Sequence, residues 1–368
     1  MKESAPKKNH SFQCYTTFAE VEARWRALES HSDGSLFQSY DWQKTYHECI
    51  GRPAGDQLQI IVVQDEHQQA IMLLPFVITT KHKLRMLMFN GGLITDYCMP
   101  LTHSNFDSKI TDISDFWVSI KKTINPCDAI YLVNQPSTFG PKSNHLSSLF
   151  YRTIVSSHAL EIDGEWEDVH TKIVPKKIRA DTRRQRKRIA ELGDLSFYVA
   201  ETDDQKKHII DTMIEQKRRR YQQMGVYDMF SNSDYSDFFK TLHETWSSPG
   251  EVHVSAMTID GVIVATHWGL VGGGRFYYLM PSYAVGAWDR FSVGRILLEE
   301  LVKWSADNKL TMFDFSLGDE PYKKAWCNQS TALYESVDYM SVAGYVFYIY
   351  KKITHTIKKY KGRLNANT

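Results

Sequence analysis

Hydrophobic residues in the first half of the chain follow helical spacing and strand spacing in turn. Apolar positions three and four residues apart predict helices over 17–28, 40–48 and 114–124. Short apolar runs bounded by polar turns predict strands, and the first two of these strands would form a hairpin. The predicted strands cover 58–63, 70–78, 84–89 and 129–133. The first half is therefore expected to contain two helices, a hairpin, a third strand, a helix and a last strand.

The second half repeats this order with a clearer turn. Asp260-Gly261, a preferred dipeptide of tight hairpin turns, joins apolar runs at 251–258 and 262–271. A strand, a helix and a strand follow over 275–280, 292–308 and 311–315. The corresponding turn residues Glu66 and Asp260 are 194 positions apart, and the strand residues Tyr131 and Phe313 are 182 apart. This repetition predicts two copies of one α/β unit.

Each predicted unit places an antiparallel hairpin beside two parallel strands that are joined by a helix. The fold class is therefore α/β, with an α+β arrangement around a mixed sheet. It differs from a Rossmann fold or a barrel, in which strand and helix alternate throughout. Between the two copies, a basic segment at 172–188 and a second stretch at 204–224 are both expected to be helical.

The chain has 368 residues, of which 42% are hydrophobic and 24% charged, as in ordinary globular proteins. At roughly 150 residues per domain, this length predicts two domains. We expect an N-terminal domain over 1–165, a C-terminal domain over 166–340 and an aromatic, basic tail over 341–368. No apolar run reaches the roughly 18 residues of a membrane span, and residues 1–15 do not resemble a secretory signal. These features predict a cytoplasmic location, with the tail as the one candidate for peripheral membrane contact.

The formal net charge of +1 conceals two strongly basic segments. Residues 172–188 carry nine basic side chains and one acid, and residues 351–363 carry six basic side chains and no acid. The first segment either binds RNA phosphates, which would make binding strongly salt-dependent, or pairs with the acidic remainder of the chain. The second, with the aromatic run before it, is either an interfacial segment for anionic lipid or a last element packed on the body.

Several common catalytic signatures are absent from the sequence. It contains no phosphate-binding P-loop, no dinucleotide-binding G-x-G-x-x-G after a strand, no H-E-x-x-H and no G-x-S-x-G. The five cysteines have no C-x-x-C spacing, so neither a zinc site nor disulfide bonds are expected. These absences weigh against NTPases, dinucleotide oxidoreductases, zinc proteases and α/β-hydrolases.

The best candidate for an anion site is the segment 289–295, which opens the predicted helix 292–308. Ser292 is a good N-cap, Gly294 would let a ligand approach the backbone, and Arg290 and Arg295 flank a helix terminus whose free N–H groups favour anions. The alternative is a capped core helix that buries its apolar face.

A second candidate group follows the last predicted strand. Pro321 suits the first turn of a helix, which places Tyr322 at its start. Tyr322 could give a proton to a leaving group, and Asp319 or Glu320 could accept one, although packing and helix-dipole roles are the alternatives. His267, within an apolar strand, would be a general base if it faces a cleft and otherwise a hydrogen-bonded or edge histidine.

Taken together, the segments 36–48, 166–193, 291–306 and 313–326 resemble a GNAT-related family of acetyltransferases involved in cellulose biosynthesis. That family is similar to the Fem-type transferases, which are built from two GNAT-like domains. The resemblance implies two tandem GNAT-like domains with an inserted basic helical segment. It also implies acyl transfer from acetyl-CoA or another acyl-CoA as co-substrate.

The resemblance further implies where the acyl donor binds. The pyrophosphate would lie on the start of the predicted helix 292–308, and backbone N–H groups of a splayed strand would polarise the thioester carbonyl. The implied donor-binding residues are Tyr278, Leu279, Met280, Arg290, Ser292, Val293, Gly294 and Arg295. The implied proton donor to the departing thiolate is Tyr322. The N-terminal copy has no comparable segment, so we expect it to be non-catalytic and to shape an acceptor groove.

The leading functional hypothesis is an acyl-CoA-dependent N- or O-acyltransferase, most simply an acetyltransferase. Its acceptor would be a sugar-derived or cell-envelope polysaccharide precursor. One alternative is Fem-like aminoacyl transfer from aminoacyl-tRNA, with the basic segment 172–188 on the RNA. The other is a non-catalytic GNAT-like component of an envelope-assembly complex.

Overall fold

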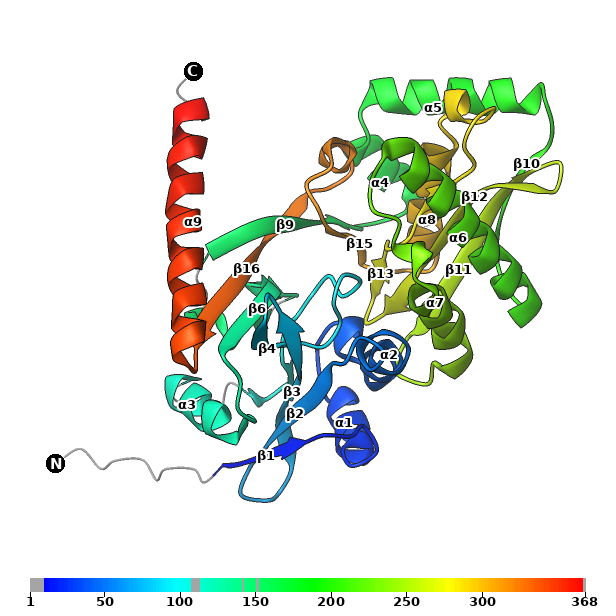
Figure 1. Cartoon of the computed structure of the whole chain (residues 1–368). Coiled ribbons are helices and arrows are strands. Elements are labelled where there is room, and N and C mark those ends of the chain that lie inside the picture. Colours follow the sequence, from blue (N-terminus) through cyan, green and yellow to red (C-terminus); the bar gives the residue numbers. More distant parts are fainter. Residues whose placement is uncertain (1–9, 107–112, 141, 150–151, 367–368) are drawn as a thin grey trace. The chain divides into compact units, whose positions relative to one another are not determined.

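The computed structural model describes residues 10–106, 113–140, 142–149 and 152–366. The chain divides into two compact units: Met1–Val155 with Ala332–Thr368, and Ser156–Thr331 (Figure 1). The boundaries of these units differ from the ranges 1–165, 166–340 and 341–368 expected for the domains. The C-terminal segment 341–368 belongs to the first unit and does not form a third part of the chain. Whether the expected ranges are independent folding domains stays a prediction.

The first unit begins with β1, which was not predicted, and then has the predicted order of elements. β1 pairs antiparallel with β2, β2 with β3 and β3 with β4, whereas β4 and β6 are parallel. Its elements are β1 (Ser11–Tyr15), α1 (Glu22–Glu29), α2 (Tyr40–Tyr46), β2 (Gln57–Gln64), β3 (Ala70–Lys81), β4 (Leu84–Phe89), α3 (Ile113–Thr123) and β6 (Ala129–Pro136). β2 and β3 are buried along most of their length, which explains their unbroken apolar runs.

The second unit has the same order, and this confirms the predicted repeat. Its elements are β10 (Leu195–Val199), α6 (Asp203–Met224), α7 (Ser233–Thr245), β11 (Glu251–Ile259), β12 (Val262–Gly272), β13 (Arg275–Tyr277), α8 (Val293–Asp307) and β15 (Met312–Leu317). Each strand from β10 to β12 pairs antiparallel with the next strand along the chain, up to β13. β13 is parallel to β15. Asp260 and Gly261 both have positive φ, as the tight turn between β11 and β12 requires.

In each unit, the last strand of the copy pairs with a strand that follows the other copy in the sequence. β9 (Arg152–Glu161) follows the first copy in sequence but pairs antiparallel with β15 of the second unit. β16 (Gln329–Tyr339) follows the second copy but pairs antiparallel with β6 of the first unit. This exchange explains why residues after 331 belong to the first unit.

The basic segment consists of two helices where one was expected. α4 (Trp166–Ile173) ends before Pro175, and α5 (Lys176–Ala190) begins after it. Pro175 lacks the N–H group that a continuous helix would need, and its ring disfavours helical backbone at Val174, which is extended. Lys172 therefore lies on α4, and the other eight basic residues of the segment lie on α5.

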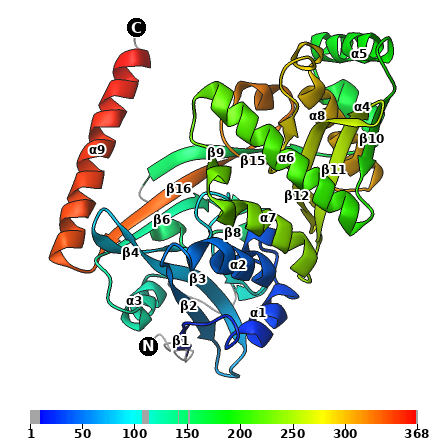
Figure 2. The ribbon, with the colours of Figure 1, turned by 45° about the vertical axis from the view of Figure 1, so that its right-hand side comes forward.

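The core of the second unit lies between its sheet and α8. Phe276 and Tyr278 stand beside Phe313 and Phe315 of β15 and pack with the buried face of α8. On the other face, α6 lies across β11 and β12 (Figure 2). None of the helices within the described residues has the length and apolar content needed to cross a membrane.

Candidate functional site

The parallel strands β13 and β15 part at Tyr278. Tyr277 is the last residue of β13 in register with β15, opposite Asp314, and the N–H of Tyr278 donates to the carbonyl of Asp314 at 2.8 Å. The chain then turns away, and the N–H of Met280 donates to Trp268 at 2.9 Å. The predicted strand 275–280 is therefore three residues too long.

Leu279 lies at this parting point between two satisfied N–H groups. Within the described ranges, its own N–H has no acceptor. Of the three predicted backbone donors Tyr278, Leu279 and Met280, only Leu279 is thus available to polarise a ligand carbonyl.

The loop after β15 is held by two buried charged side chains. Asp314 accepts from the Arg275 guanidinium at 2.6 Å and from the Ser316 N–H at 2.7 Å. Lys323 donates to the carbonyl oxygens of Leu317 at 2.8 Å and Gly318 at 3.2 Å. These bonds stabilise the positive φ angles of Ser316 and Gly318 and fix the 3-10 helix η7 (Pro321–Ala325).

Tyr322 occupies the first turn of η7, as predicted, with Pro321 at the N-terminal position. Its side chain is 45% exposed, and its ring lies 6.3 Å from that of Phe315. Partial burial, and then the Glu320 carboxylate, raise the pKa of Tyr322 well above its ordinary value of 10.0. The hydroxyl therefore stays protonated at neutral pH and can donate a proton.

Asp319 and Glu320 are both engaged in ion pairs. Asp319 accepts from Nε2 of His158 at 2.9 Å, and this bond lowers the pKa of Asp319 below 3.8. Glu320 lies 2.9 Å from the ammonium group of Lys323. The lowered pKa makes Asp319 a weak base at neutral pH.

His267 is fully buried against aromatic rings of the core. Its ring stacks on Tyr278 at 5.1 Å and lies 5.6 Å from His253. Among the described residues, neither ring nitrogen of His267 has a hydrogen-bond partner. Burial, and then His253, lower the pKa of His267 well below 6.5, so the ring is neutral. The hydrogen-bonded state expected for a buried histidine is not found, and the general-base prediction for His267 lacks the cleft that it requires.

The start of α8 differs from the predicted cap. Ser292 precedes the helix, but its backbone is left-handed at φ 54° and its side chain makes no capping bond. The short helix η6 (Asp289–Phe291) leads into Ser292 and imposes this turn. The carbonyl of Ser292 accepts from Arg295 and Ile296, whereas the N–H groups of Val293 and Gly294 have no acceptor among the described residues. Two donors are therefore available to an anion.

Gly294 packs against the ring of a neighbouring tyrosine. A Cβ atom at this position would lie 3.0 Å from the ring of Tyr283. The guanidinium of Arg220, from α6, covers the same ring at 4.5 Å from its centroid. The expectation that Gly294 leaves open space for a ligand is therefore wrong, because Tyr283 fills that space.

A groove lies between α5 and the start of α8. Its volume is about 590 Å³, and it is lined by Lys177, Ile178, Ala180, Asp181, Arg184 and Arg295. Arg295 pairs with Asp181, and this bond lowers the pKa of Asp181 below 3.8. Nε of Arg295 is buried and has no acceptor among the described residues. The cations Lys177, Arg184 and Arg295 of the groove fit an anionic group.

Arg290 does not line this groove. Its guanidinium stacks on Phe291 at 4.8 Å, and Arg188 of α5 lies 5.0 Å from the same ring. The two predicted anion-binding arginines thus differ in role, and only Arg295 faces the groove.

Lys177, Asp181 and Arg184 were not predicted as site residues. Their spacing of four and three residues on one helix places them on the same face, so the sequence does contain a signal for them. They line the groove only because α5 packs against α8, and the spacing of residues within one helix does not predict this packing.

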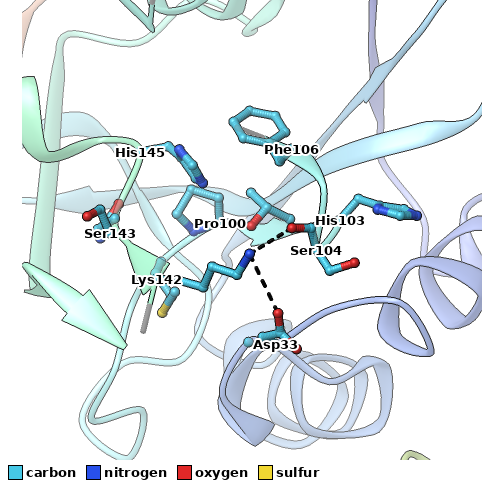
Figure 3. A pocket seen from close by; sticks show the side chains of 12 residues that line it. Asp33, Pro100, His103, Ser104, Phe106, Lys142, Ser143 and His145 are labelled. Atoms are coloured by element: carbon cyan, nitrogen blue, oxygen red, sulfur yellow. Dashed lines mark hydrogen bonds and ion pairs between the residues drawn. The ribbon is translucent and has the colours of Figure 1, made fainter. Parts of the chain in front are cut away.

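A separate small pocket lies in the first unit (Figure 3). The Lys142 ammonium group donates to the carbonyl of Ser104 at 2.7 Å and lies 3.8 Å from the Asp33 carboxylate. His145 packs against Phe106 at 4.3 Å between ring centroids. The pocket contains none of the predicted site residues.

Residues 176–324 match the family model of the acetyltransferase (GNAT) domain. This range contains α5, the strand parting, the start of α8 and Tyr322. The second unit is therefore similar to the GNAT acetyltransferase domain over most of its length, as the resemblance implied. No curated protein matches the sequence.

Several solved structures share the fold. The chain is similar to FemX, with 13% identity, a TM-score of 0.64, and coverage of 92% of this chain and 99% of FemX. A protein of unknown function from Bacteroides thetaiotaomicron VPI-5482 gives 13% identity, a TM-score of 0.55 and coverage of 89% and 99%. L-PGS from Bacillus licheniformis gives 11% identity, a TM-score of 0.50 and coverage of 87% and 92%. At these identities the likeness concerns the fold alone.

Proposed function

We propose that this protein is an acyl-CoA-dependent N- or O-acyltransferase, with acetyl-CoA or another acyl-CoA as co-substrate. The observation that carries the proposal is the parting of β13 and β15 at Tyr278 within the matched GNAT domain. It leaves the N–H of Leu279 without an acceptor among the described residues. The free N–H groups at the start of α8 and the cationic groove support the same assignment.

Each part of the site has a distinct role in this proposal. Bound acyl-CoA would supply a thioester whose acyl group moves to an amine or hydroxyl. Val293, Gly294 and Arg295 would hold its phosphates, with Lys177 and Arg184 adding positive charge. The Leu279 N–H would polarise the thioester carbonyl, because it is fixed and lacks a competing acceptor.

Tyr322 would supply the proton that the leaving sulfur needs. Its hydroxyl is protonated at neutral pH and would transfer the proton as negative charge develops on the sulfur. The proton lost by the acceptor would go to water or to a nearby carboxylate, for which Asp319 and Glu320 are the candidates. The acceptor proposed is a sugar-derived or envelope polysaccharide precursor, and the first unit would contribute to its groove without catalysing transfer.

Calorimetric titration with acetyl-CoA tests the donor. We expect binding by the wild-type protein, and at least tenfold weaker binding by Arg184→Gln or Lys177→Gln, because each loses a cation of the groove. Arg183→Gln is the matched control, since Arg183 is exposed on α5 but does not line the groove. Absence of binding at millimolar acetyl-CoA would exclude the proposed donor.

Aminoacyl-tRNA is the alternative donor. Lys176, Arg183 and Lys187 of α5 are exposed and lie outside the groove, which favours a phosphate backbone as a further ligand. Other basic residues of α5 pair with acidic residues of the same unit, and Arg186 lies 2.7 Å from Glu300. RNA binding that falls steeply with salt would support this donor, and no RNA binding at low salt would reject it.

Mass-shift screening identifies the acceptor. The protein is incubated with acetyl-CoA and a panel of amino sugars and sugar nucleotides, and each acceptor is searched for an added acetyl group. A protein that binds acetyl-CoA but neither hydrolyses nor transfers it to any acceptor would indicate the non-catalytic alternative.

A further inference from the structure

The C-terminal helix α9 (Val342–Ala366) is held against the first unit by one face only. Gly344 lies directly on the backbone carbonyl of Asp128, where a Cβ atom would overlap the oxygen. The ring of Phe347 packs on that of Tyr131 at 5.7 Å. One turn further, the Lys351 ammonium group donates to the Tyr131 hydroxyl at 2.8 Å and to Glu335 at 3.1 Å. These contacts fix the rotation of α9 about its own axis.

The opposite face of α9 is apolar and exposed. Val346 is 64% exposed and Ile353 is 54% exposed, although both are branched aliphatic side chains. The exposed apolar residues follow helical spacing and form one stripe, at Val342, Tyr345, Val346, Ile349, Tyr350 and Ile353. The sequence continues the same spacing with Ile357, Tyr360 and Leu364. This reverses the usual arrangement, in which the apolar face of a surface helix points to the core.

Basic residues accompany this stripe, and α9 contains no acidic residue. Lys351 is used in the contact with the sheet, which leaves five basic residues along the rest of the helix: Lys352, Lys358, Lys359, Lys361 and Arg363. At 100° per residue, positions 352, 359 and 363 fall on one edge of the stripe and position 361 on the other. The stripe therefore lies between two basic edges.

We propose that α9 docks this protein on an anionic membrane surface, with the apolar stripe in the interfacial layer. Aromatic and aliphatic side chains between basic edges are the composition that binds this layer, and each basic residue adds roughly fivefold in affinity for anionic lipid. A second copy of the chain is a poorer occupant, because pairing two such stripes would bring the basic residues of both helices together, and α9 carries no acid to offset them. α9 lies on the membrane and does not span it.

Figures 1 and 2 show α9 within the first unit. In both views α9 is one continuous helix that follows the end of β16. Because the stripe is exposed, it can contact a surface without a change in the contacts of Gly344, Phe347 and Lys351.

Vesicle co-sedimentation of the full chain tests the proposal independently of any acyl transfer. Vesicles of phosphatidylcholine and phosphatidylglycerol at 3:1 are compared with vesicles of phosphatidylcholine alone. We expect at least tenfold tighter binding to the anionic vesicles. Val346→Glu with Ile353→Glu should weaken this binding at least tenfold. The control Val262→Glu, at a 64% exposed position of β12, should leave it unchanged.

A second variant alters charge and keeps the stripe. Replacement of Lys358, Lys359, Lys361 and Arg363 by glutamine should abolish the preference for anionic vesicles. Equal binding to both vesicle types, no binding by the wild type, or wild-type binding by the stripe variant would each overturn the proposal. Light scattering decides the remaining case: a wild-type dimer that the stripe variant loses, without vesicle binding, would assign the stripe to self-association.

Discussion

Tyr322 is partly exposed and its hydroxyl is protonated at neutral pH, so it can act as a proton donor at the edge of a site. Tyr322→Phe removes the proton and leaves the ring contact with Phe315. We expect turnover to fall at least 100-fold, while the dissociation constant of acetyl-CoA changes less than twofold. Thiol release measures turnover, and calorimetry measures binding. Tyr339→Phe, an exposed tyrosine of the first unit, is the control, and unchanged turnover in Tyr322→Phe would remove this hydroxyl from the mechanism.

Glu335 is buried among cations in the first unit. It is 1% exposed, pairs with Arg152, and accepts from Lys351 and from the Tyr131 hydroxyl at 2.8 Å. Glu335→Gln would remove a buried negative charge that pairs with two partly buried cations, Arg152 and Lys351, so we expect the free energy of unfolding to fall by roughly 3 kcal/mol. Asp338 lies on the same strand as Glu335 and makes a partly exposed ion pair with Lys121 of α3. Asp338→Asn breaks this pair and should lower the free energy of unfolding by at most about 1 kcal/mol. Urea unfolding at pH 7 measures both, and equal losses would contradict the expected difference.

The same cluster predicts a pH dependence. Burial alone would raise the pKa of Glu335, but the bonds from Arg152 and Tyr131 and the charge of Lys351 lower it below 4.5 overall. A lowered folded-state pKa stabilises the fold above the unfolded value and loses that effect as the pH falls. The stability difference between wild type and Glu335→Gln should therefore be full at pH 6–7 and shrink below about pH 4.5. A difference that stays constant down to pH 3 would contradict this assignment.

At the level of elements, Gly344 controls how α9 sits on the sheet. Gly344→Ala forces a Cβ atom onto the carbonyl of Asp128, and backbone cannot move aside as a side chain can. We expect a loss of about 1–3 kcal/mol and faster proteolysis within α9. Ala343→Gly is the control, because Ala343 is exposed and glycine at this position changes helix propensity alone. A proteolysis rate in Gly344→Ala equal to that of the wild type would show that α9 does not contact the Asp128 carbonyl at this position.

Elements with strong local signals were predicted well from the sequence. The β11–β12 hairpin carries its own turn residues, and α8 carries an apolar face, so both lie within a residue or two of the expected bounds. Ser292 and Gly294 were placed correctly at the start of α8 but were given the wrong roles. Their roles depend on η6 and on Tyr283, which reach them only through tertiary packing.

At the level of the whole molecule, the exchange of β9 and β16 could not be predicted from hydrophobic spacing. β9 has a mixed pattern of exposed and buried residues, and its partner β15 is more than 150 positions away in the sequence. The internal repeat was detectable because it preserves the order of elements. The exchange was not detectable, because the hydrophobic pattern of β9 or β16 fits equally well beside β6 of the first copy or β15 of the second.

The exchange predicts an effect of truncation at the opposite end of the chain. Removal of residues 332–368 takes β16 and α9 from the first unit and leaves every element of the second unit in place. β6 then becomes an edge strand with unpaired backbone groups, although it lies about 200 residues before the cut. We expect hydrogen-exchange protection to fall at least tenfold in β4 and β6 and to stay near wild type in β11 and β12. Loss confined to the second unit would contradict the exchange, because β16 pairs with β6 and its side chains Glu335 and Asp338 also contact Tyr131 and Lys121 of the first unit.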